Sequence, residues 1–194
     1  VVGRDNVPDG PVIFAGNHPN SLIDPALIVA VARRPIHFAA KDVLFSKPWL
    51  KPFLTGLGAV PIRRRMDHGG KVDNAAAFEA LTAVLGRGAC MGIFPEGISH
   101  DLAQLQTLKT GALRIAFGAK REHPDMPLHV VPVGLTYVRP RAFRSRALVQ
   151  FGEPIEIPVP AADEDAERAE VRELTDELET RLRALTINAE DWAT

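Results

Sequence analysis

Short apolar runs rich in β-branched residues alternate along this chain with longer segments that carry helical periodicity. Six runs are candidate strands: Val12–Ala15, His37–Ala40, Ala59–Ile62, Ala89–Phe94, Val130–Leu135 and Leu148–Phe151. The candidate helices between them are Leu22–Arg33, Lys47–Leu57, Gly70–Gly86 and Leu108–Ala119. Because such alternation is typical of βαβ units, we expect an α/β fold with a central, mostly parallel or mixed sheet flanked by helices.

The last part of the chain differs in charge from the rest. Residues 151–194 carry 13 acidic and four basic side chains, whereas residues 1–150 carry 11 acidic and 19 basic. Apolar residues recur there at three- and four-residue steps, at Val171, Leu174, Leu178, Leu182 and Leu185. This pattern predicts an acidic amphipathic helix. We expect a main domain over residues 1–160 and a helical segment, residues 161–194, that packs on it or extends it; a partner-binding helix is the alternative.

The basic excess of the main part indicates anionic substrates or an anionic membrane surface. Nucleic acid is not expected as a partner, because the basic residues do not alternate with aromatics in a recognisable module. No apolar stretch approaches twenty residues, so we expect no bilayer-spanning segment. The chain begins Val-Val-Gly without an initiator Met, which predicts a piece of a longer protein. The single cysteine, Cys90, is expected to be buried and inert.

The segment GNHPNSLIDP, residues 16–25, directly follows the first candidate strand. It places His18 and Asp24 with five residues between them, where a helical pattern begins. Histidine accepts a proton near neutral pH, and a carboxylate on its other ring nitrogen orients the ring and raises its basicity. The intervening Pro-Asn-Ser predicts a turn that brings the two side chains together. The pair is a candidate catalytic dyad; a capping cluster with a surface histidine is the alternative.

Arginines follow the third candidate strand in the segment GAVPIRRR, which ends in Arg63, Arg64 and Arg65. A guanidinium group is always charged and offers paired donors that suit phosphate. The segment therefore predicts a phosphate site, and a solvated basic strand end is an equally good reading of these residues alone.

The segment GIFPEGISH ends another apolar strand, where α/β folds keep their ligands. Glu96 is a candidate for binding a substrate hydroxyl, and Gly97 permits close approach of the backbone. Ser99 and His100 add hydrogen-bonding groups, while a turn with an exposed glutamate is the alternative. A fourth segment, VVPVGLTY, is an apolar strand that we expect to break at Gly134 and to be mostly core, with its end lining a cleft.

Other classes of site lack their sequence signatures. His18, Asp24, Glu96 and His100 are metal-ligand types, but no H-x-x-x-H or C-x-x-C spacing accompanies them, so no metal is expected. There is no G-x-S-x-G elbow of a serine hydrolase, no P-loop and no dinucleotide-binding glycine fingerprint.

The order of the four segments resembles the glycerolipid acyltransferase family, which includes glycerol-3-phosphate and 1-acylglycerol-3-phosphate (lysophosphatidate) acyltransferases. That family carries N-H-x-x-x-x-D, G-x-x-x-x-x-R, F-P-E-G and an apolar V-P-V block in this order. The similar residues here are Asn17-His18 with Asp24, Gly58 with Arg64, Phe94-Pro95-Glu96-Gly97, and Val131-Pro132-Val133. The likeness covers roughly residues 3–157, and it implies the α/β fold of that family.

Two features depart from the commonest family pattern. Five residues, not four, separate His18 from Asp24, and Ile98-Ser99-His100 replaces the usual Thr-Arg-Ser. Both departures occur together in the branch that is similar to fungal glycerol-3-phosphate/dihydroxyacetone-phosphate acyltransferases, with F-P-E-G-x-S-H. This resemblance favours the first acylation step of phospholipid biosynthesis.

The resemblance implies direct acyl transfer from acyl-CoA or an acyl carrier protein to a hydroxyl of a phosphorylated acceptor such as glycerol 3-phosphate or lysophosphatidate. His18, held by Asp24, would remove the hydroxyl proton as the oxygen attacks the thioester, so no nucleophilic serine or cysteine is needed. Glu96 would bind the glycerol hydroxyls, and Gly97 would let the backbone approach the substrate. No cofactor is expected beyond the acyl donor itself.

The implied phosphate ligand is Arg64, with Arg63 as the alternative. Because the arginine usual after F-P-E-G is absent, phosphate binding is expected to depend more on Lys41 and Lys109. Two rival functions remain: a thioesterase that uses the same histidine to activate water, and a lipid-binding module without catalysis.

Long acyl chains partition into bilayers, so we expect this chain at the cytoplasmic side of a membrane, bound peripherally or anchored through segments absent from it. The segment LFSKPWLKPFLTGLG is a candidate contact, because aromatic and basic residues together suit a membrane interface. Its apolar residues are Phe45, Trp49, Leu50, Phe53 and Leu54, beside Lys47 and Lys51. A core-facing helix is the alternative.

Overall fold

The computed structural model describes residues 1–56, 58–63, 74–100, 102–139 and 142–189. Its strands are β1 Val12–Gly16, β2 Ile36–Lys41, β3 Val60–Ile62, β4 Cys90–Ile93, β5 His129–Tyr137, β6 Ala147–Phe151 and β7 Ile155–Glu156. Its helices are the 3₁₀ turn η1 Arg4–Asn6 and the α-helices α1 Ile23–Ala32, α2 Asp42–Phe45, α3 Lys51–Gly56, α5 Ala75–Gly86, α6 Gly111–Glu122 and α7 Glu164–Leu185.

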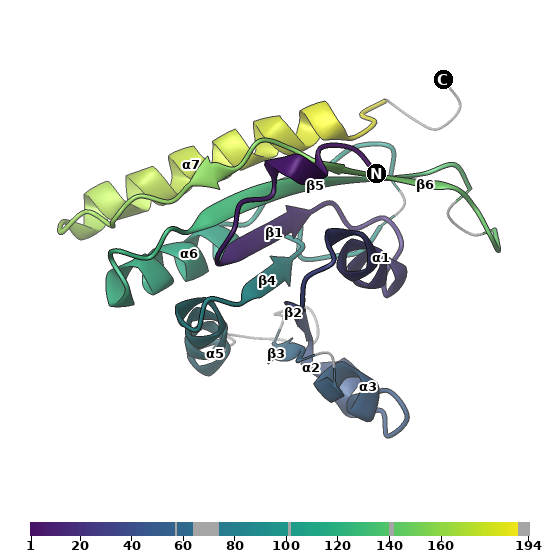
Figure 1. The fold of residues 1–194 in the computed structure, drawn as a ribbon, viewed down its shortest axis with the longest axis horizontal. Helices are drawn as coiled ribbons and strands as arrows, with labels where there is room; N and C mark the ends of the chain where they lie inside the picture. Colours follow the sequence, from purple (N-terminus) through teal and green to yellow (C-terminus); the bar gives the residue numbers. More distant parts are fainter. Residues whose placement is uncertain (57, 64–73, 101, 140–141, 190–194) are drawn as a thin grey trace.

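The described strands form one seven-stranded mixed sheet in the order β3-β2-β4-β1-β5-β6, with β7 also pairing with β5 (Figure 1). The strands β1 to β5 are mutually parallel, and β6 and β7 run antiparallel to β5. The expected α/β fold with a mostly parallel central sheet is thus confirmed. All carboxyl ends of β1 to β5 meet at one edge of the sheet, the edge that α/β folds use for ligands.

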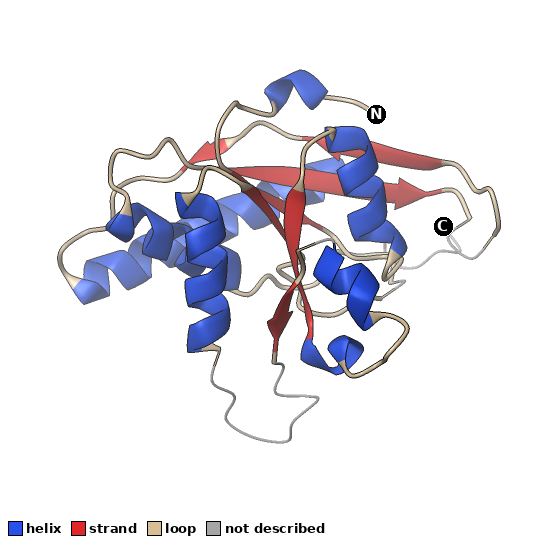
Figure 2. Cartoon of the chain, turned by 60° about the horizontal axis from the view of Figure 1, so that its bottom comes forward, coloured by secondary structure: helices blue, strands red, loops and turns tan. Residues whose placement is uncertain are grey.

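Helices cover both faces of the sheet (Figures 1 and 2). Alternate residues of β1 point to opposite faces, as strand geometry requires. Phe14 packs in a cluster with Ile28 of α1, whereas Ile13 packs on the other face with residues of α5, α6 and α7. Every residue of β1 is buried, which explains why the central strand reads as a continuous apolar run.

The acidic C-terminal helix contributes to the core with its apolar stripe. Val171, Leu178 and Leu182 are buried in the cluster that contains α5, α6 and β1, and Leu174 packs against it. The first turn of α7 is acidic, and Asp163 caps the helix by accepting a hydrogen bond from the backbone N–H of Ala166 at 2.8 Å. The division into residues 1–160 and 161–194 stays a prediction.

Two expected boundaries were wrong. The helix expected from Leu108 begins at Gly111, because the backbone N–H of Lys109 donates to the carbonyl of Pro95 at 2.9 Å and holds that residue in the loop after β4. The strand expected to break at Gly134 runs on to Tyr137. A glycine in mid-strand has another reason here: a side chain at that position would collide with the backbone of Leu185.

The helix expected over Lys47–Leu57 is shorter in the structure, α3 over Lys51–Gly56, and a second short helix, α2, precedes the expected range. Leu50 and Leu54 are buried, as a core-facing helix predicts, whereas 73% of Trp49 is exposed. Likewise, α5 begins at Ala75, and residues 64–73 lie outside the described part of the chain. Among the helices that the structure describes, none is long and apolar enough to cross a membrane.

Candidate active site

The loop after β1 brings His18 against Asp24, which lies in the first turn of α1. The Nδ1 atom of His18 is 2.8 Å from Oδ2 of Asp24. The same oxygen accepts a hydrogen bond from the backbone N–H of Asn20 at 2.7 Å. The hydroxyl of Tyr137 donates a hydrogen bond to the other carboxylate oxygen, Oδ1, at 2.7 Å. The carboxylate is therefore held in a fixed direction, and the predicted turn does join the two side chains.

Burial and charge explain why this carboxylate can stay in the interior. The Asp24 side chain has no exposed surface, but it accepts hydrogen bonds and lies at the positive amino end of α1. Burial raises the pKa of Tyr137, and the adjacent Asp24 carboxylate raises it further. The phenol thus keeps its proton and remains a hydrogen-bond donor across the physiological pH range.

Glu96 is the second buried acid of the site, and it holds the backbone of the loop after β1. Its Oε1 accepts a hydrogen bond from the backbone N–H of His18 at 3.0 Å. Its Oε2 lies 2.6 Å from Nε2 of His100 and accepts a hydrogen bond from the backbone N–H of Gln106 at 2.8 Å. Only 3% of Glu96 is exposed. A carboxylate has about four lone-pair sites, and these contacts use three of them. The binding of substrate hydroxyls by Glu96 stays a prediction.

Aromatic rings fix the plane of the imidazole. The ring of His18 stacks on Phe94 with centroids 3.9 Å apart and 5° between the planes. Phe94 in turn stacks on Phe38 of β2 at 5.6 Å. The imidazole is therefore clamped between a hydrogen bond to Asp24 and a ring face, and 17% of its side chain is exposed.

The two motif loops are also joined on their outer side. Ser99 Oγ accepts hydrogen bonds from the backbone N–H and the hydroxyl of Ser21, at 3.0 and 3.1 Å. The backbone N–H of His100 donates to the carbonyl of His18 at 3.1 Å. Gly97 has φ of +72°, and a Cβ at this position would lie 2.5 Å from Nζ of Lys109. The glycine thus leaves room for the ammonium group beside the F-P-E-G turn.

Sequence reasoning missed the contacts that three residues make in this site. Tyr137 ends the fourth segment, but nothing in the pattern showed that it reaches Asp24. Phe94 was read as a motif residue without its stacking role. Asn17 accepts from the backbone N–H of Leu135 at 2.7 Å and donates to its carbonyl at 3.0 Å, which ties the loop after β1 to β5. The one signal was position, since all three residues stand at the carboxyl ends of predicted strands.

The expected phosphate ligands are placed only in part. Lys41 ends β2, Arg63 follows β3, and both therefore lie at the carboxyl edge of the sheet. The Nε atom of Arg63 is 3.7 Å from Oδ2 of Asp42, and its side chain is largely exposed. Lys109 is exposed beside Gly97. Arg64, the first choice from the sequence, lies outside the described residues.

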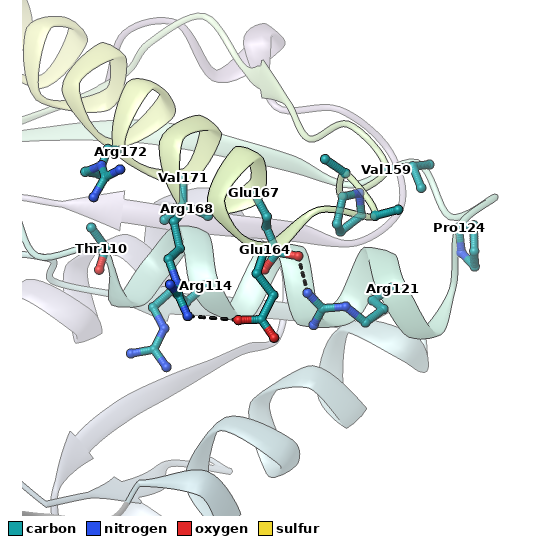
Figure 3. Close-up of a pocket in the computed structure, with 13 residues that line it drawn as sticks. Thr110, Arg114, Arg121, Pro124, Val159, Glu164, Glu167, Arg168, Val171 and Arg172 are labelled. Atoms are coloured by element: carbon teal, nitrogen blue, oxygen red, sulfur yellow. Dashed lines mark hydrogen bonds and ion pairs between the residues drawn. The ribbon is translucent and has the colours of Figure 1, made fainter.

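Two hollows differ in their relation to these residues. A small cavity of about 50 Å³ is lined by Asn17, Glu96 and His100 together with Thr186 and Ile187, which follow α7. A larger, open groove of about 810 Å³ lies between α6 and the start of α7 (Figure 3). It contains none of the motif residues, and its arginines Arg121 and Arg168 form ion pairs with acidic residues of α7. The motif residues therefore line the small cavity and not the larger groove.

The described residues contain no group of three or more His, Cys, Asp or Glu side chains arranged to hold a metal ion. Cys90 is buried, as expected, and burial raises the pKa of its thiol. What the arrangement offers is one oriented imidazole. No hydrogen bond among the described residues engages its Nε2 atom, so this nitrogen can accept a proton from a bound hydroxyl.

Comparisons with known proteins agree with this geometry. Residues 1–136 match the family described as Acyltransferase. Glycerol-3-phosphate O-acyltransferase 1 of Saccharomyces cerevisiae is 36% identical over 159 residues, which cover 79% of this chain and 20% of the yeast protein. The 1-acyl-sn-glycerol-3-phosphate acyltransferase of Borreliella burgdorferi is 30% identical over 118 residues, or 60% of this chain and 45% of that protein. The chain spans about a fifth of the length of the yeast relatives it matches.

A solved structure is similar as well. The crystal structure of the 1-acyl-sn-glycerophosphate acyltransferase from Thermotoga maritima superposes with a TM-score of 0.61 at 22% identity, over 92% of this chain and 71% of that one. This likeness shows a shared fold. Together with the family match and the yeast relative, it confirms the resemblance drawn from the four motifs: the chain belongs to the acyltransferase family that includes glycerol-3-phosphate and 1-acylglycerol-3-phosphate acyltransferases.

Proposed function

We propose that this chain is the catalytic part of an O-acyltransferase that moves a fatty acyl group from a thioester donor to a hydroxyl of glycerol 3-phosphate. The observation that carries the proposal is the hydrogen bond of 2.8 Å between His18 and the fully buried Asp24, which orients a partly exposed imidazole. The names of the yeast relatives favour glycerol 3-phosphate over lysophosphatidate as acceptor, as does the resemblance of the two motif departures to the fungal branch.

The reaction follows from the tautomer that Asp24 selects. With the Nδ1 proton donated to the carboxylate, Nε2 carries the lone pair. Nε2 takes the proton of the acceptor hydroxyl as that oxygen bonds to the thioester carbonyl carbon. The tetrahedral intermediate then expels the thiolate, which takes a proton from the imidazolium, so an ester and a free thiol result. Asp24 stabilises the imidazolium between the two steps.

The acceptor phosphate is assigned to the basic residues at the same edge. Lys109 beside Gly97, together with Lys41 and Arg63 after neighbouring strands, brings positive charge to this edge, and Arg64 adjoins Arg63 in the sequence. In this proposal Glu96 binds the glycerol hydroxyls, and Ser99 and His100 lie beside it. The donor is acyl-CoA or an acyl carrier protein, and the chain works at the cytoplasmic face of a membrane.

The test measures thiol release from palmitoyl-CoA, or from an acyl carrier protein loaded with palmitate, in detergent micelles. Glycerol 3-phosphate, dihydroxyacetone phosphate and lysophosphatidate are supplied in turn to the wild type, to His18→Ala and to His123→Ala. His123 is an exposed histidine after α6 and serves as the control. We expect release that requires an acceptor, is fastest with glycerol 3-phosphate and is lost only in His18→Ala.

Each rival function gives a different result. Release of equal rate without any acceptor identifies a thioesterase, in which His18 activates water. No release with either donor and any acceptor, from folded protein, supports a lipid-binding module. Release that is fastest with lysophosphatidate keeps the acyl transfer and corrects the acceptor.

A further inference from the structure

The β5–β6 hairpin projects from the sheet past α1 (Figures 1 and 2). Its end bears the most exposed of the large apolar side chains in the described part of the chain, Phe143, which is 92% exposed. Val138, one residue beyond β5, is 64% exposed. A phenylalanine held almost entirely in water at the end of a hairpin has no role in the packing of this domain, so its apolar surface is available to a partner.

Positive charge surrounds these apolar side chains. Arg139, Arg144 and Arg146 are exposed, and the guanidinium carbon of Arg144 lies 5.5 Å from the centre of the Phe143 ring. No acidic residue occurs between Tyr137 and Gly152. Among the described residues, none of the three arginines takes part in an ion pair. Their charge is therefore free to meet an external anion.

The hairpin is a direct continuation of the active-site edge. Its first strand ends at Tyr137, whose hydroxyl donates to Asp24 at 2.7 Å. Backbone hydrogen bonds join the two described sides of the hairpin, such as that from Val138 N–H to the carbonyl of Arg146 at 3.0 Å. Leu22 and Ile23, which lie between His18 and Asp24 in the sequence, are also exposed, at 45% and 52%. Exposed apolar side chains thus occur both on the hairpin and in the turn that holds the dyad.

We propose that the β5–β6 hairpin is an interfacial anchor that docks the active-site edge on an anionic lipid bilayer. Phe143 enters the region between headgroups and acyl chains, and the arginines bind lipid phosphates around it. The proposal rests on the proposed function in one respect: an enzyme whose acyl donor partitions into a bilayer needs its active-site edge at that surface. The segment around Trp49 is the weaker anchor, because Leu50 and Leu54 face the core.

The experiment measures binding of the 194-residue chain to vesicles of phosphatidylcholine, with and without 30 mole per cent phosphatidylglycerol, by flotation and without substrate. Phe143→Ser removes the apolar anchor. Its control is Val159→Ser, which removes an apolar side chain that is 56% exposed on the segment before α7. Arg144→Gln with Arg146→Gln removes two charges of the hairpin. Arg87→Gln with Arg172→Gln removes two exposed charges elsewhere.

An arginine close to an anionic surface contributes a factor of about five in partitioning, so the hairpin pair is expected to lower binding to anionic vesicles about 25-fold. Phe143→Ser is expected to lower binding to both kinds of vesicle, and both control variants are expected to bind as the wild type does. A loss that is equal in hairpin and control variants overturns the proposal, because general charge and not the hairpin then governs binding. Absence of any vesicle binding by the wild type also overturns it.

A second readout locates the inserted side chain. Phe143→Trp, in a chain whose Trp49 and Trp192 are replaced by phenylalanine, provides a fluorescent probe at the hairpin. On vesicles its emission is expected to shift to the blue and to be quenched by brominated lipids. Quenching of Trp49 alone, in the chain that keeps only that tryptophan, would assign the contact to the other segment. Thiol release in detergent micelles is expected to be unchanged by Phe143→Ser, so failure of this anchor is distinguishable from failure of the proposed reaction.

Discussion

The Nδ1 atom of His18 and the Oδ2 atom of Asp24 lie 2.8 Å apart although five residues, one more than in the commonest family pattern, separate them. The extra residue is accommodated in the turn, where Ser21 adopts a left-handed conformation with φ of 49°. Asn20 then points its backbone N–H at the carboxylate of Asp24. The loop with five intervening residues thus still forms the hydrogen bond between the two side chains.

The first prediction concerns this dyad. His18→Ala removes the proposed base, and we expect kcat to fall by about 10²- to 10⁴-fold, the usual contribution of general base catalysis. Asp24→Asn is expected to have a similar effect, because an amide no longer orients or stabilises the imidazolium. The measurement is acceptor-dependent thiol release, with circular dichroism to show that both variants fold. Activity within threefold of wild type in either variant would contradict the assigned role.

Tyr137 gives a prediction about alkaline pH. Because burial and the Asp24 carboxylate raise its pKa in the folded protein, the phenol is expected to keep its proton above pH 10, where an unfolded tyrosine ionises. The chain has a single tyrosine, so absorbance near 295 nm reports this group alone. We expect no tyrosinate signal until the protein unfolds. Ionisation of the folded protein with a midpoint near pH 10 would contradict the buried hydrogen bond.

The same pKa shift affects stability with a definite sign. Because the pKa of Tyr137 is higher in the folded than in the unfolded protein, its protonated phenol stabilises the fold. This contribution to the unfolding free energy is fully present below about pH 10 and is lost as pH rises above it. Tyr137→Phe removes this ionisable group. We therefore expect the unfolding free energy of the wild type to fall more steeply above pH 10 than that of Tyr137→Phe, as measured by urea unfolding at several pH values.

Hydrophobic periodicity and motif order predict the fold class and the placement of the His18–Asp24 pair, and particular residues show why. The continuous apolar run of β1 and the F-P-E-G turn after β4 report local geometry, because strands end where glycine and polar residues begin. Contacts between distant segments leave no such trace. The hydrogen bond from Tyr137 to Asp24 joins residues 113 positions apart in the chain. The start of α6 depends on the hydrogen bond from the Lys109 N–H to the Pro95 carbonyl. Both features result from tertiary contacts, which local sequence patterns do not report.

Glu96→Gln tests whether the buried glutamate is structural as well as functional. Glutamine keeps the shape but replaces one carboxylate oxygen by an NH₂ group that cannot accept, so the side chain loses either the hydrogen bond from His18 or the contacts with His100 and Gln106. Leaving buried donors without acceptors costs about 1–3 kcal/mol, and we expect the unfolding free energy to fall by this amount. Either loss loosens a loop that holds His18 in place, so kcat should fall as well. Glu122→Gln, at the exposed end of α6, is the control.

If Glu96→Gln lowers acceptor affinity and leaves the unfolding free energy unchanged, the carboxylate binds substrate and its three protein contacts add little. Urea unfolding and the acceptor KM together separate these outcomes.

The C-terminal helix yields a prediction about domain organisation. Leu178 is fully buried in the core cluster on the α5–α6 face of the sheet. Leu178→Ala is expected to lower the unfolding free energy by about 2–5 kcal/mol, the usual cost of removing a buried leucine. Glu173→Ala, on the exposed side of α7, should change it little. A small effect of Leu178→Ala would show that α7 is an appendage of the domain and not part of its core.

Gly97 tests the proposed phosphate site through its neighbour Lys109. An alanine at this position has to adopt φ of +72°, and its Cβ would lie 2.5 Å from the Lys109 ammonium nitrogen. The left-handed conformation costs about 1–2 kcal/mol for a non-glycine residue, and the exposed lysine has to move away from the F-P-E-G turn. We expect Gly97→Ala to lower stability by this amount and to raise the acceptor KM with little change in kcat.

Gly88→Ala separates the effect on stability from the effect on KM, because Gly88 has φ of +76° with nothing within 4 Å of its added Cβ. This variant should lose the same stability and keep the wild-type KM. Lys109→Met, which keeps the stem and removes the charge, should raise the KM without the loss of stability. A wild-type KM in both Gly97→Ala and Lys109→Met would remove Lys109 from the phosphate site and leave that role to the arginines after β3.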